Sequence, residues 1–240
     1  MLSENKQISS CYSKFERPML DAPITMRIKF CKVGNLQFIS HLDLQRTFHR
    51  ILVRAGIPMW YTKGFNPHAK LVFGLPLSVG AESVCEFADL KIERQITPDE
   101  VISQLNANLT DEMYVLDAYI PSTKFADIAY ASYTITINSG KISPSDARGV
   151  KELFSAPVNM IKKTKSGEKE VDITQFIKNL DTSVCDNKLV INAVVRAGNV
   201  ESLNPEYLIS AIKERFDFMK DACYGIMRNT VYNSNMEEFK

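Results

Sequence analysis

The spacing of apolar and polar residues predicts an alternating series of strands and helices in the first half of the chain. Residues 26–33 alternate between apolar and polar and predict a strand. Ser40 then begins a helix as its N-cap, with an apolar face made by Leu44, Phe48, Ile51 and Ala55. After a short strand at 57–62, the remaining elements follow from the same patterns. They are strands at 71–77, 83–92 and 113–120, and a helix that begins at Thr97 and ends near residue 109.

This order of strand, helix, strand, strand, helix, strand is typical of the ferredoxin-like βαββαβ arrangement, so the fold class is α+β. The second half has a comparable set of elements and predicts a related α+β unit. Its elements are a strand at 132–138, a helix at 144–154, a hairpin of 158–163 and 169–171 around the turn TKSG, a short helix at 172–177, a strand at 188–196 and a helix at 205–217.

Two subdomains are expected, at residues 24–121 and 131–232, each an antiparallel sheet with its helices packed on one face. Residues 121–130 read as the linker between them. The polar residues 1–23 read as a flexible N-terminal extension, and residues 233–240 as a tail. No repeat of individual residues relates the two halves.

Composition narrows the class of protein. The chain is 45% hydrophobic and 24% charged, values typical of a globular protein and not of a disordered one. No run of 18 apolar residues occurs, so no membrane partner is expected, and the first residues lack the apolar core of a signal peptide. The five cysteines are odd in number and lie at least 20 residues apart. This spacing favours a reducing cytoplasm and predicts neither a disulfide framework nor a cysteine metal site; no cofactor is expected.

Charge is distributed unevenly along the chain. The net charge is only +1, yet residues 24–80 carry eight basic residues against one acid, Asp43. Such a segment either attracts anions or is a solvated surface that the acidic remainder neutralises. Within it, Arg46, Arg50 and Arg54 share the side of the predicted helix opposite its apolar face. Arginines at this spacing can bind successive phosphates, although Asp43 lies in the same stripe and can pair with them.

The segment 60–73 combines aromatic and basic side chains. Trp60, Tyr61, Phe65 and Phe73 alternate with Lys63, His68 and Lys70, and Gly64, Asn66 and Pro67 form a turn-rich loop. This combination suits base stacking and phosphate neutralisation in a nucleic-acid site. The simpler interpretation is that Trp60 and Phe73 are core residues of strands and that Phe65 packs under its own loop.

The chain contains no recognised catalytic motif, but three residues are candidates for acid–base chemistry. His41 and Asp43 lie at a helix start, and His68 lies in the aromatic loop. Glu82, Glu86 and Asp89 follow closely and would complete a metal or acid–base group if the fold gathered them with the histidines. The spacing alone predicts no metal site. The simpler interpretation is that Ser40 and Asp43 cap the helix.

Several long motifs resemble the family described as radical SAM-linked proteins. They are FISHLDLQRTFHR, RAGIP, KGFNPHAKLVFGLPL and VGAES, with later similarity in TKSGEKEVDITQFI, GNVESLNPEYLISAI and IMRNTVYN. The resemblance implies a domain of unknown function that occurs fused behind, or encoded beside, radical SAM proteins, in a genomic context of ribonuclease and ribosomal-protein genes. Because the CxxxCxxC triad of an iron–sulfur cluster is missing, the chain resembles the stand-alone domain and a radical SAM protein is the expected partner. The motif residues are Ser40, His41, Asp43, Arg46, Arg54, Gly64, Phe65, Asn66, Pro67, His68, Pro76, Gly80, Glu82 and Ser83.

Three functions follow from these features. The first is an accessory module that binds RNA, either tRNA or rRNA, for a modifying or processing enzyme. Its expected ligand-binding residues are Arg46, Arg50, Arg54, Lys63, Gly64, Phe65, Asn66, Lys70 and Glu82. The second is an enzyme acting on a phosphate-bearing substrate through His41, Asp43 and His68. The third is a protein-binding adaptor anchored by the aromatic loop.

Overall fold

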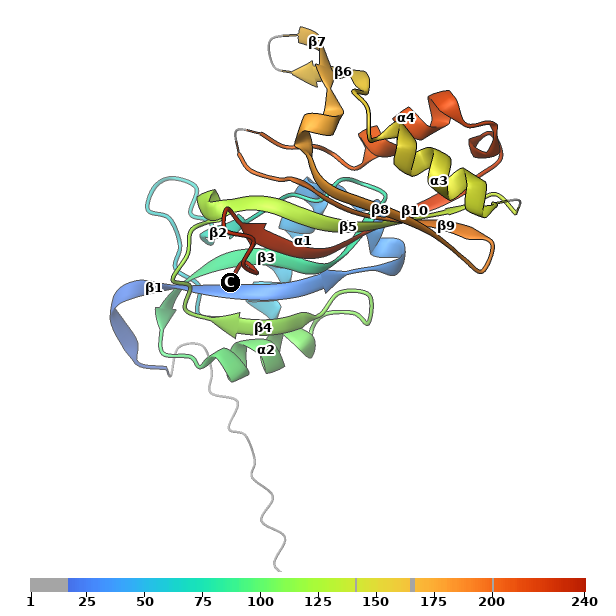
Figure 1. Ribbon diagram of the computed structural model, residues 1–240. Coiled ribbons are helices and arrows are strands. Elements are labelled where there is room, and N and C mark those ends of the chain that lie inside the picture. Colours follow the sequence, from blue (N-terminus) through green and yellow to red (C-terminus); the bar gives the residue numbers. More distant parts are fainter. Residues whose placement is uncertain (1–16, 141, 165–166, 200) are drawn as a thin grey trace, which may run out of the picture.

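The first half of the chain folds into the predicted ferredoxin-like arrangement (Figure 1). The computed structural model describes residues 17–140, 142–164, 167–199 and 201–240. The sheet order is β4-β1-β3, and β2 pairs with the other side of β3; every one of these pairs is antiparallel. The elements are β1 (Met19–Lys32), α1 (His41–Arg54), β2 (Leu71–Phe73), β3 (Ala81–Arg94), α2 (Pro98–Asn106) and β4 (Val115–Tyr119), with a 3-10 turn η1 (Gly34–Phe38).

The second half repeats this topology. Its sheet order is β10-β5-β9-β8, again antiparallel throughout, and a separate hairpin of β6 and β7 is inserted before β8. The elements are β5 (Ile128–Asn138), α3 (Pro144–Leu153), β6 (Asn159–Thr164), β7 (Gly167–Asp172), β8 (Ile177–Cys185), β9 (Lys188–Arg196), α4 (Glu206–Arg215) and β10 (Cys223–Asn233). Three further 3-10 turns are η2 (Phe125–Asp127), η3 (Ile173–Phe176) and η4 (Asp217–Met219). Strands β8 and β10, which complete the second unit, were not predicted from the pattern.

Local capping explains why three of the helices begin where the sequence indicates. The Ser40 side chain accepts a hydrogen bond from the Asp43 backbone N–H at the start of α1. Thr97 and Ser143 form complete capping boxes at the starts of α2 and α3, each followed directly by a proline. The buried face of α1 consists of Leu44, Phe48, Ile51 and Leu52.

The two units join into one continuous sheet through β3 and β10. These strands run parallel and pair at three positions, Ala81–Ser83 with Ile226–Arg228. We call this junction the seam. Strand β10 can pair with β3 here because β2 pairs only with the other end of β3, at Ala88–Leu90. The division into two subdomains stays a prediction, since the sheet crosses its boundary without interruption.

All four helices cover the same face of this sheet. One row of cross-strand partners runs from β1 through the seam to β9; it consists of Lys32, Ser83, Arg228, Tyr133 and Ala193. Side chains alternate along a strand, so Phe30 shares a face with Lys32, and Ile135 shares one with Tyr133. Phe30 packs in the apolar cluster of α1 and α2, whereas Ile135 packs in that of α3 and α4. None of the four α-helices in the described part of the chain lies on the opposite face.

Buried charges separate the two apolar clusters at the seam. Arg228 forms an ion pair with Glu86 and donates a hydrogen bond to the Leu75 carbonyl oxygen at 2.7 Å. Lys32 donates to the carbonyl oxygens of Leu36 and Ala81, at 3.1 and 3.2 Å. Burial lowers the pKa of Lys32, and burial also raises the pKa of the neighbouring Cys85 thiol to about 11. The two halves are therefore linked by the hydrogen bonds of these buried charged groups as well as by the sheet, although the Nε of Arg228 is buried without a partner.

Residues 17–23 and 233–240 pack more closely than expected. The prediction of a flexible extension is wrong for residues 17–23, because Arg17 pairs with Glu100 at 2.9 Å and β1 already begins at Met19. Residues 1–16 lie outside the described part. Residues 233–240 are not a free tail, because Phe239 is buried and its backbone N–H donates to Val231 at 2.8 Å.

Several predicted boundaries also change. The expected strand at 57–62 is reduced to two isolated bridges, Met59 with Ile92 and Tyr61 with Ala69, since Pro58 lacks the backbone N–H that a longer ladder needs. The expected linker is shorter than 121–130, because β5 begins at Ile128. The hairpin of residues 158–171 is confirmed, although residues 165–166 of its turn lie outside the described residues.

We expect the substitution Arg228→Met to lower the free energy of unfolding by about 3–5 kcal/mol, because it leaves the buried Glu86 carboxylate without its partner. Urea denaturation at neutral pH measures the change. The double variant Arg228→Met/Glu86→Leu removes both charges and should recover much of the loss. Equal destabilisation of the single and double variants would contradict the ion-pair explanation.

Candidate nucleic-acid interface

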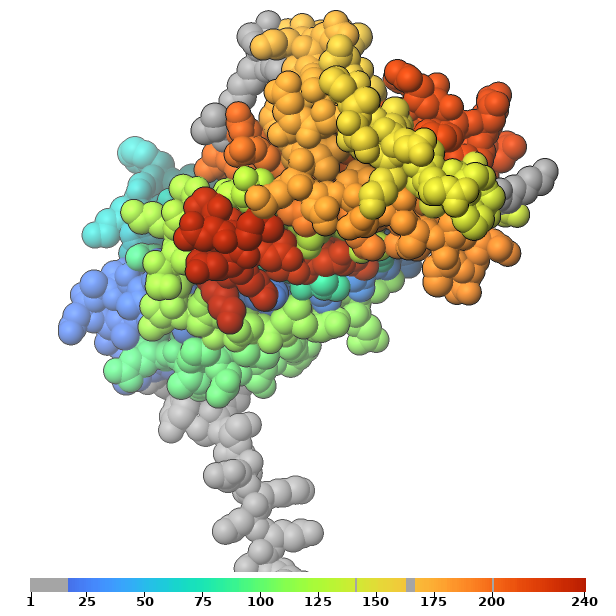
Figure 2. Space-filling view, in the orientation of Figure 1, coloured from blue at the N-terminus to red at the C-terminus, as the bar shows by residue number. Residues whose placement is uncertain are grey.

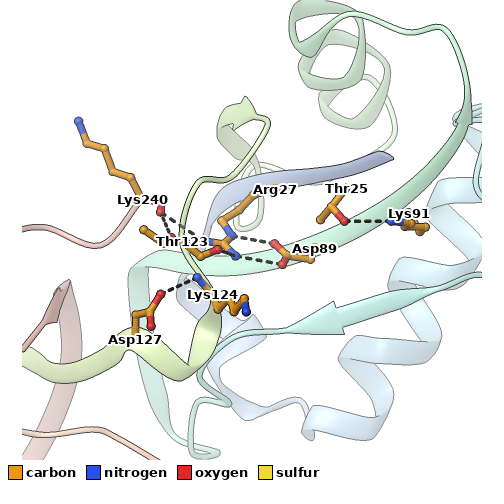
Figure 3. A network of polar contacts seen from close by, with 8 residues as sticks. All are labelled: Thr25, Arg27, Asp89, Lys91, Thr123, Lys124, Asp127 and Lys240. Carbon is orange, nitrogen blue, oxygen red and sulfur yellow. Dashed lines mark hydrogen bonds and ion pairs between the residues drawn. The ribbon is translucent and has the colours of Figure 1, made fainter. Parts of the chain in front are cut away.

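The helix-free face of the first unit carries the polar side chains of its central strands. Met26, Ile28 and Phe30 of β1 pack against α1 and α2, so the intervening residues of β1 point to the opposite face. The cross-strand pairs on this open face are Thr25 with Lys91, Arg27 with Asp89, and Lys29 with Phe87. The first two pairs lie side by side in Figure 3.

The side chain of Arg27 occupies the middle of this open face. Its guanidinium binds both oxygens of Asp89, at 2.7 and 3.0 Å, and donates to the Thr123 hydroxyl at 2.8 Å (Figure 3). The rings of Phe125 and Phe239 lie over it, with centroids at 4.3 and 4.9 Å. These contacts neutralise Asp89 and hold residues 121–127 and the C-terminal residues on the sheet. Figure 2 shows the C-terminal residues (dark red) covering this part of the surface.

A cleft of about 550 Å³ lies on the open face beside the Arg27 cluster. Trp60 and Lys70 border it from one side, and Lys91 borders it from β3. The Trp60 backbone is fixed to β3, because its N–H donates to the Lys91 carbonyl oxygen at 2.7 Å. The complete lining is Pro23, Thr25, Trp60, Lys70, Val72, Asp89, Leu90 and Lys91.

The cleft carries an excess of positive charge. Among the described residues, neither Lys70 nor Lys91 has a carboxylate partner; Lys91 only donates to the Thr25 hydroxyl at 3.4 Å. The one acid in the lining, Asp89, is already paired with Arg27. A partly exposed indole beside two unpaired lysines can stack on a planar ring and attract an anion at the same time. The site therefore suits an aromatic ligand that carries phosphate.

The aromatic residues of segment 60–73 divide between core and surface. Phe73 packs among Phe30, Phe48 and His41, with ring centroids 5.3–6.2 Å apart. Phe73 is thus half-buried and packs against the core of the first unit. The idea that Phe65 packs under its own loop is wrong, because its side chain is fully exposed. Lys63 and Asn66 are exposed in the same loop, around Gly64.

The three arginines of α1 do not act as one group. Arg46 pairs with Asp43 at 3.2 Å, and Arg54 donates to the Asn108 side-chain oxygen at 2.9 Å and to its main-chain oxygen. Arg50, which has no such partner among the described residues, lies with Arg54 beside a groove of about 300 Å³. This groove lies between α1 and residues 108–113, so the arginines do not line the Trp60 cleft.

The candidate acid–base residues each have a separate structural contact. The His41 ring packs edge-on against Phe73, at 5.3 Å between centroids. The hydrogen bond from Ser40 and the contact with Arg46 hold the pKa of Asp43 below its usual value. His68 hydrogen-bonds within its own loop, to Thr62 at 3.1 Å. The structure does not join these three residues by any hydrogen bond.

The nearby acids are also engaged elsewhere. Glu82 accepts a hydrogen bond from the Gly34 backbone N–H at 2.6 Å, Glu86 pairs with Arg228 and Asp89 pairs with Arg27. In the described part of the chain, no three His, Cys, Asp or Glu side chains are placed to hold a metal ion. Nor is any described helix long and apolar enough to cross a membrane.

Sequence reasoning found part of this cleft and missed the rest. Trp60 and Lys70 were identified because they are close together in the sequence. Thr25 and Lys91 were missed, since both are distant in the sequence: Lys91 meets Trp60 and Lys70 through backbone hydrogen bonds, and Thr25 joins them through the register of β1 with β3. The alternation of residues 26–33 indicated which side chains share a face, but not which strand lies beside them.

We expect His49 to titrate below pH 6.5, because burial lowers its pKa and the nearby His68 adds a smaller effect. Stability from neutral His49 is then present above pH 6.5 and lost as the pH falls. In the His68→Gln variant the pKa of His49 should rise but stay below 6.5. Proton NMR titration measures both values, with His49→Gln to assign the resonance. A pKa of 6.5 or higher would show that burial does not control this residue.

Comparison with known proteins places this duplicated ferredoxin-like chain in a family. The model of the family described as "Uncharacterized protein conserved in bacteria (DUF2344)" matches residues 25–205. Because the match covers more than half of the sequence, the chain belongs to this family of uncharacterized bacterial proteins. A search of curated proteins finds no match.

Solved structures show a distant likeness. A Cbf5-Nop10-Gar1 complex matches with 10% identity and a TM-score of 0.47, covering 92% of this chain and 53% of the other. An H/ACA RNP bound to a substrate RNA containing 2′-deoxyuridine matches with 11% identity and a TM-score of 0.46, covering 85% and 46%. The chain spans about half the length of these proteins, and a likeness at this level carries no inference about function.

Proposed function

We propose that this protein is an accessory module that binds RNA on the open face of its first unit. A base of a single-stranded segment stacks on Trp60, and the phosphates beside it contact Lys70 and Lys91. The observation that supports this proposal is the cleft itself, which one partly exposed indole lines together with two lysines that have no carboxylate partners among the described residues. Base stacking on an aromatic side chain contributes about 1–3 kcal/mol, and basic side chains hold the backbone.

This proposal moves the expected RNA contact from the arginines of α1 to the sheet. Two of the three arginines are already bonded to Asp43 and Asn108, whereas the lysines of the cleft have no acidic partner among the described residues. The pairing of Asp89 with Arg27 removes the one negative charge that would repel a phosphate there. A tRNA or an rRNA with an unpaired segment has the required chemistry.

The resemblance to radical SAM-linked proteins supports a second component of this proposal. A radical SAM protein would act on the RNA that this chain holds, because the chain lacks the cysteine triad itself. Co-purification of the two proteins from cell extract is the expected result, and purification of this chain without any such protein would contradict it. The catalytic and adaptor functions stay alternative predictions, and no contact among the described residues favours either one.

We expect single-stranded RNA to quench the fluorescence of Trp60, which is the one tryptophan of the chain. The quenching should be saturable and should weaken as salt rises, because bound phosphates release counterions. In Lys70→Ala or Lys91→Ala, the slope of log Kd against log salt should fall by about 0.7. Trp60→Ala should weaken binding of labelled RNA by about 1–3 kcal/mol, measured by anisotropy.

A charge-matched control is Lys169→Ala, which removes an exposed lysine of β7. This lysine is distant in the sequence from every residue that lines the cleft. This variant should keep the salt slope of the wild type. Quenching that persists unchanged in the Lys70→Ala and Lys91→Ala variants would contradict the proposed site. Absence of any quenching at low salt would contradict RNA binding on Trp60.

A further inference from the structure

Trp60 and Lys70 form the base of a hairpin-like arm, which we define as residues 60–70. The Lys70 N–H donates to the Trp60 carbonyl oxygen, and the Thr62 N–H donates to that of His68, both at 3.0 Å. Tyr61 and Ala69 form a bridge between these two bonds. The arm projects from the body of the molecule in Figures 1 and 2 (cyan).

The tip of the arm is held in one shape by its own polar groups. The Thr62 hydroxyl accepts the His68 backbone N–H at 3.2 Å, and the His68 ring nitrogen Nδ1 lies 3.1 Å from the same hydroxyl. Nδ1 also lies 3.2 Å from the Asn66 carbonyl oxygen. Gly64 has φ +144°, a backbone conformation that residues with a Cβ rarely adopt. Together these features restrain the backbone of the loop that carries Phe65.

Phe65 is fully exposed at this fixed tip. A single exposed apolar residue is common on protein surfaces. Here, however, the hydrogen bonds of Thr62 and His68 hold the loop in a shape that keeps the ring in water. Such an arrangement presents the ring to a ligand and lowers the entropic cost of binding, because the loop is already ordered.

The charge of the arm favours an anionic ligand. Residues 60–73 contain no acid, and among the described residues neither Lys63 nor Lys70 has an ion-pair partner. An exposed aromatic ring between unpaired lysines is the arrangement found in surfaces that stack bases of a single strand. This chemistry favours a nucleic acid over an apolar protein surface, which would leave the two lysines without partners.

We propose that Phe65 is a second base-stacking position and that the RNA ligand is a single strand running along the arm from Trp60 to Phe65. This inference rests on the proposed function of the Trp60 cleft and adds the length of RNA that the protein recognises. Five residues of extended chain span about 16 Å. At about 3.4 Å per stacked nucleotide, this distance corresponds to about five nucleotides.

The test compares oligouridylates of different length with the wild type and with Phe65→Ala, read by Trp60 fluorescence. An oligomer of about two nucleotides reaches only Trp60, so both proteins should bind it equally. An oligomer of about ten nucleotides reaches both rings, and Phe65→Ala should weaken its binding by about tenfold. Phe65→Tyr keeps an aromatic ring and should restore the wild-type affinity. Phe65 is exposed, so its substitution leaves the core intact.

A second variant, Gly64→Ala, keeps Phe65 but strains the loop that directs it. It should weaken binding of the long oligomer and leave that of the short one unchanged. If Phe65→Ala and the wild type bind the long oligomer with equal affinity, Phe65 is not a second stacking position. The proposed binding at the Trp60 cleft would still stand in that case, provided that the oligomers quench Trp60. Absence of quenching by either oligomer in the wild type would instead overturn the proposed function, and this inference with it.

Discussion

The ion pair between Arg228 and Glu86 is the contact on which the architecture of this protein depends. Arg228 belongs to the last strand of the second unit and Glu86 to the third strand of the first, so the pair crosses the seam. Strands β3 and β10 share only three paired positions, which is a short ladder for joining two sheets. A buried ion pair contributes little net stability, but it penalises every arrangement in which either charge loses its partner. It thereby favours this register of the two units over other pairings.

The open face of the first unit is built around the same strand β3. Strand β3 pairs with β10 at Ala81–Ser83 and with β2 at Ala88–Leu90, and the alternation of its side chains places Asp89 and Lys91 on the helix-free side. Arg27 and the rings over it cover one part of that face, and the Trp60 cleft occupies the part beside it. The residues proposed to bind RNA thus come from β1, β3 and the arm, which the sheet holds together, and the tip with Phe65 extends this surface beyond the edge of the sheet.

Local signals made most of the first unit predictable. Ser40 and Thr97 bond the backbone N–H groups three residues later, so the starts of α1 and α2 are set within a single turn. Strand β10 was missed because it carries Gly225 and a buried arginine, and the partner of that arginine lies 142 residues away in the sequence. Strand β8 was missed because its residues are mostly polar or half-exposed. Likewise, Trp60 and Lys70 are recognisable as a local combination, whereas Lys91 joins them only through backbone hydrogen bonds between segments that are distant in the sequence.

We propose that RNA lies on the arm and the open face of the first unit. Ultraviolet cross-linking of single-stranded RNA to the purified protein, followed by mass spectrometry of the linked peptides, would locate the bound RNA. We expect cross-links at Trp60 and Phe65, with none in the second unit. Cross-links confined to the arginines of α1 or to residues of β5–β10 would contradict it.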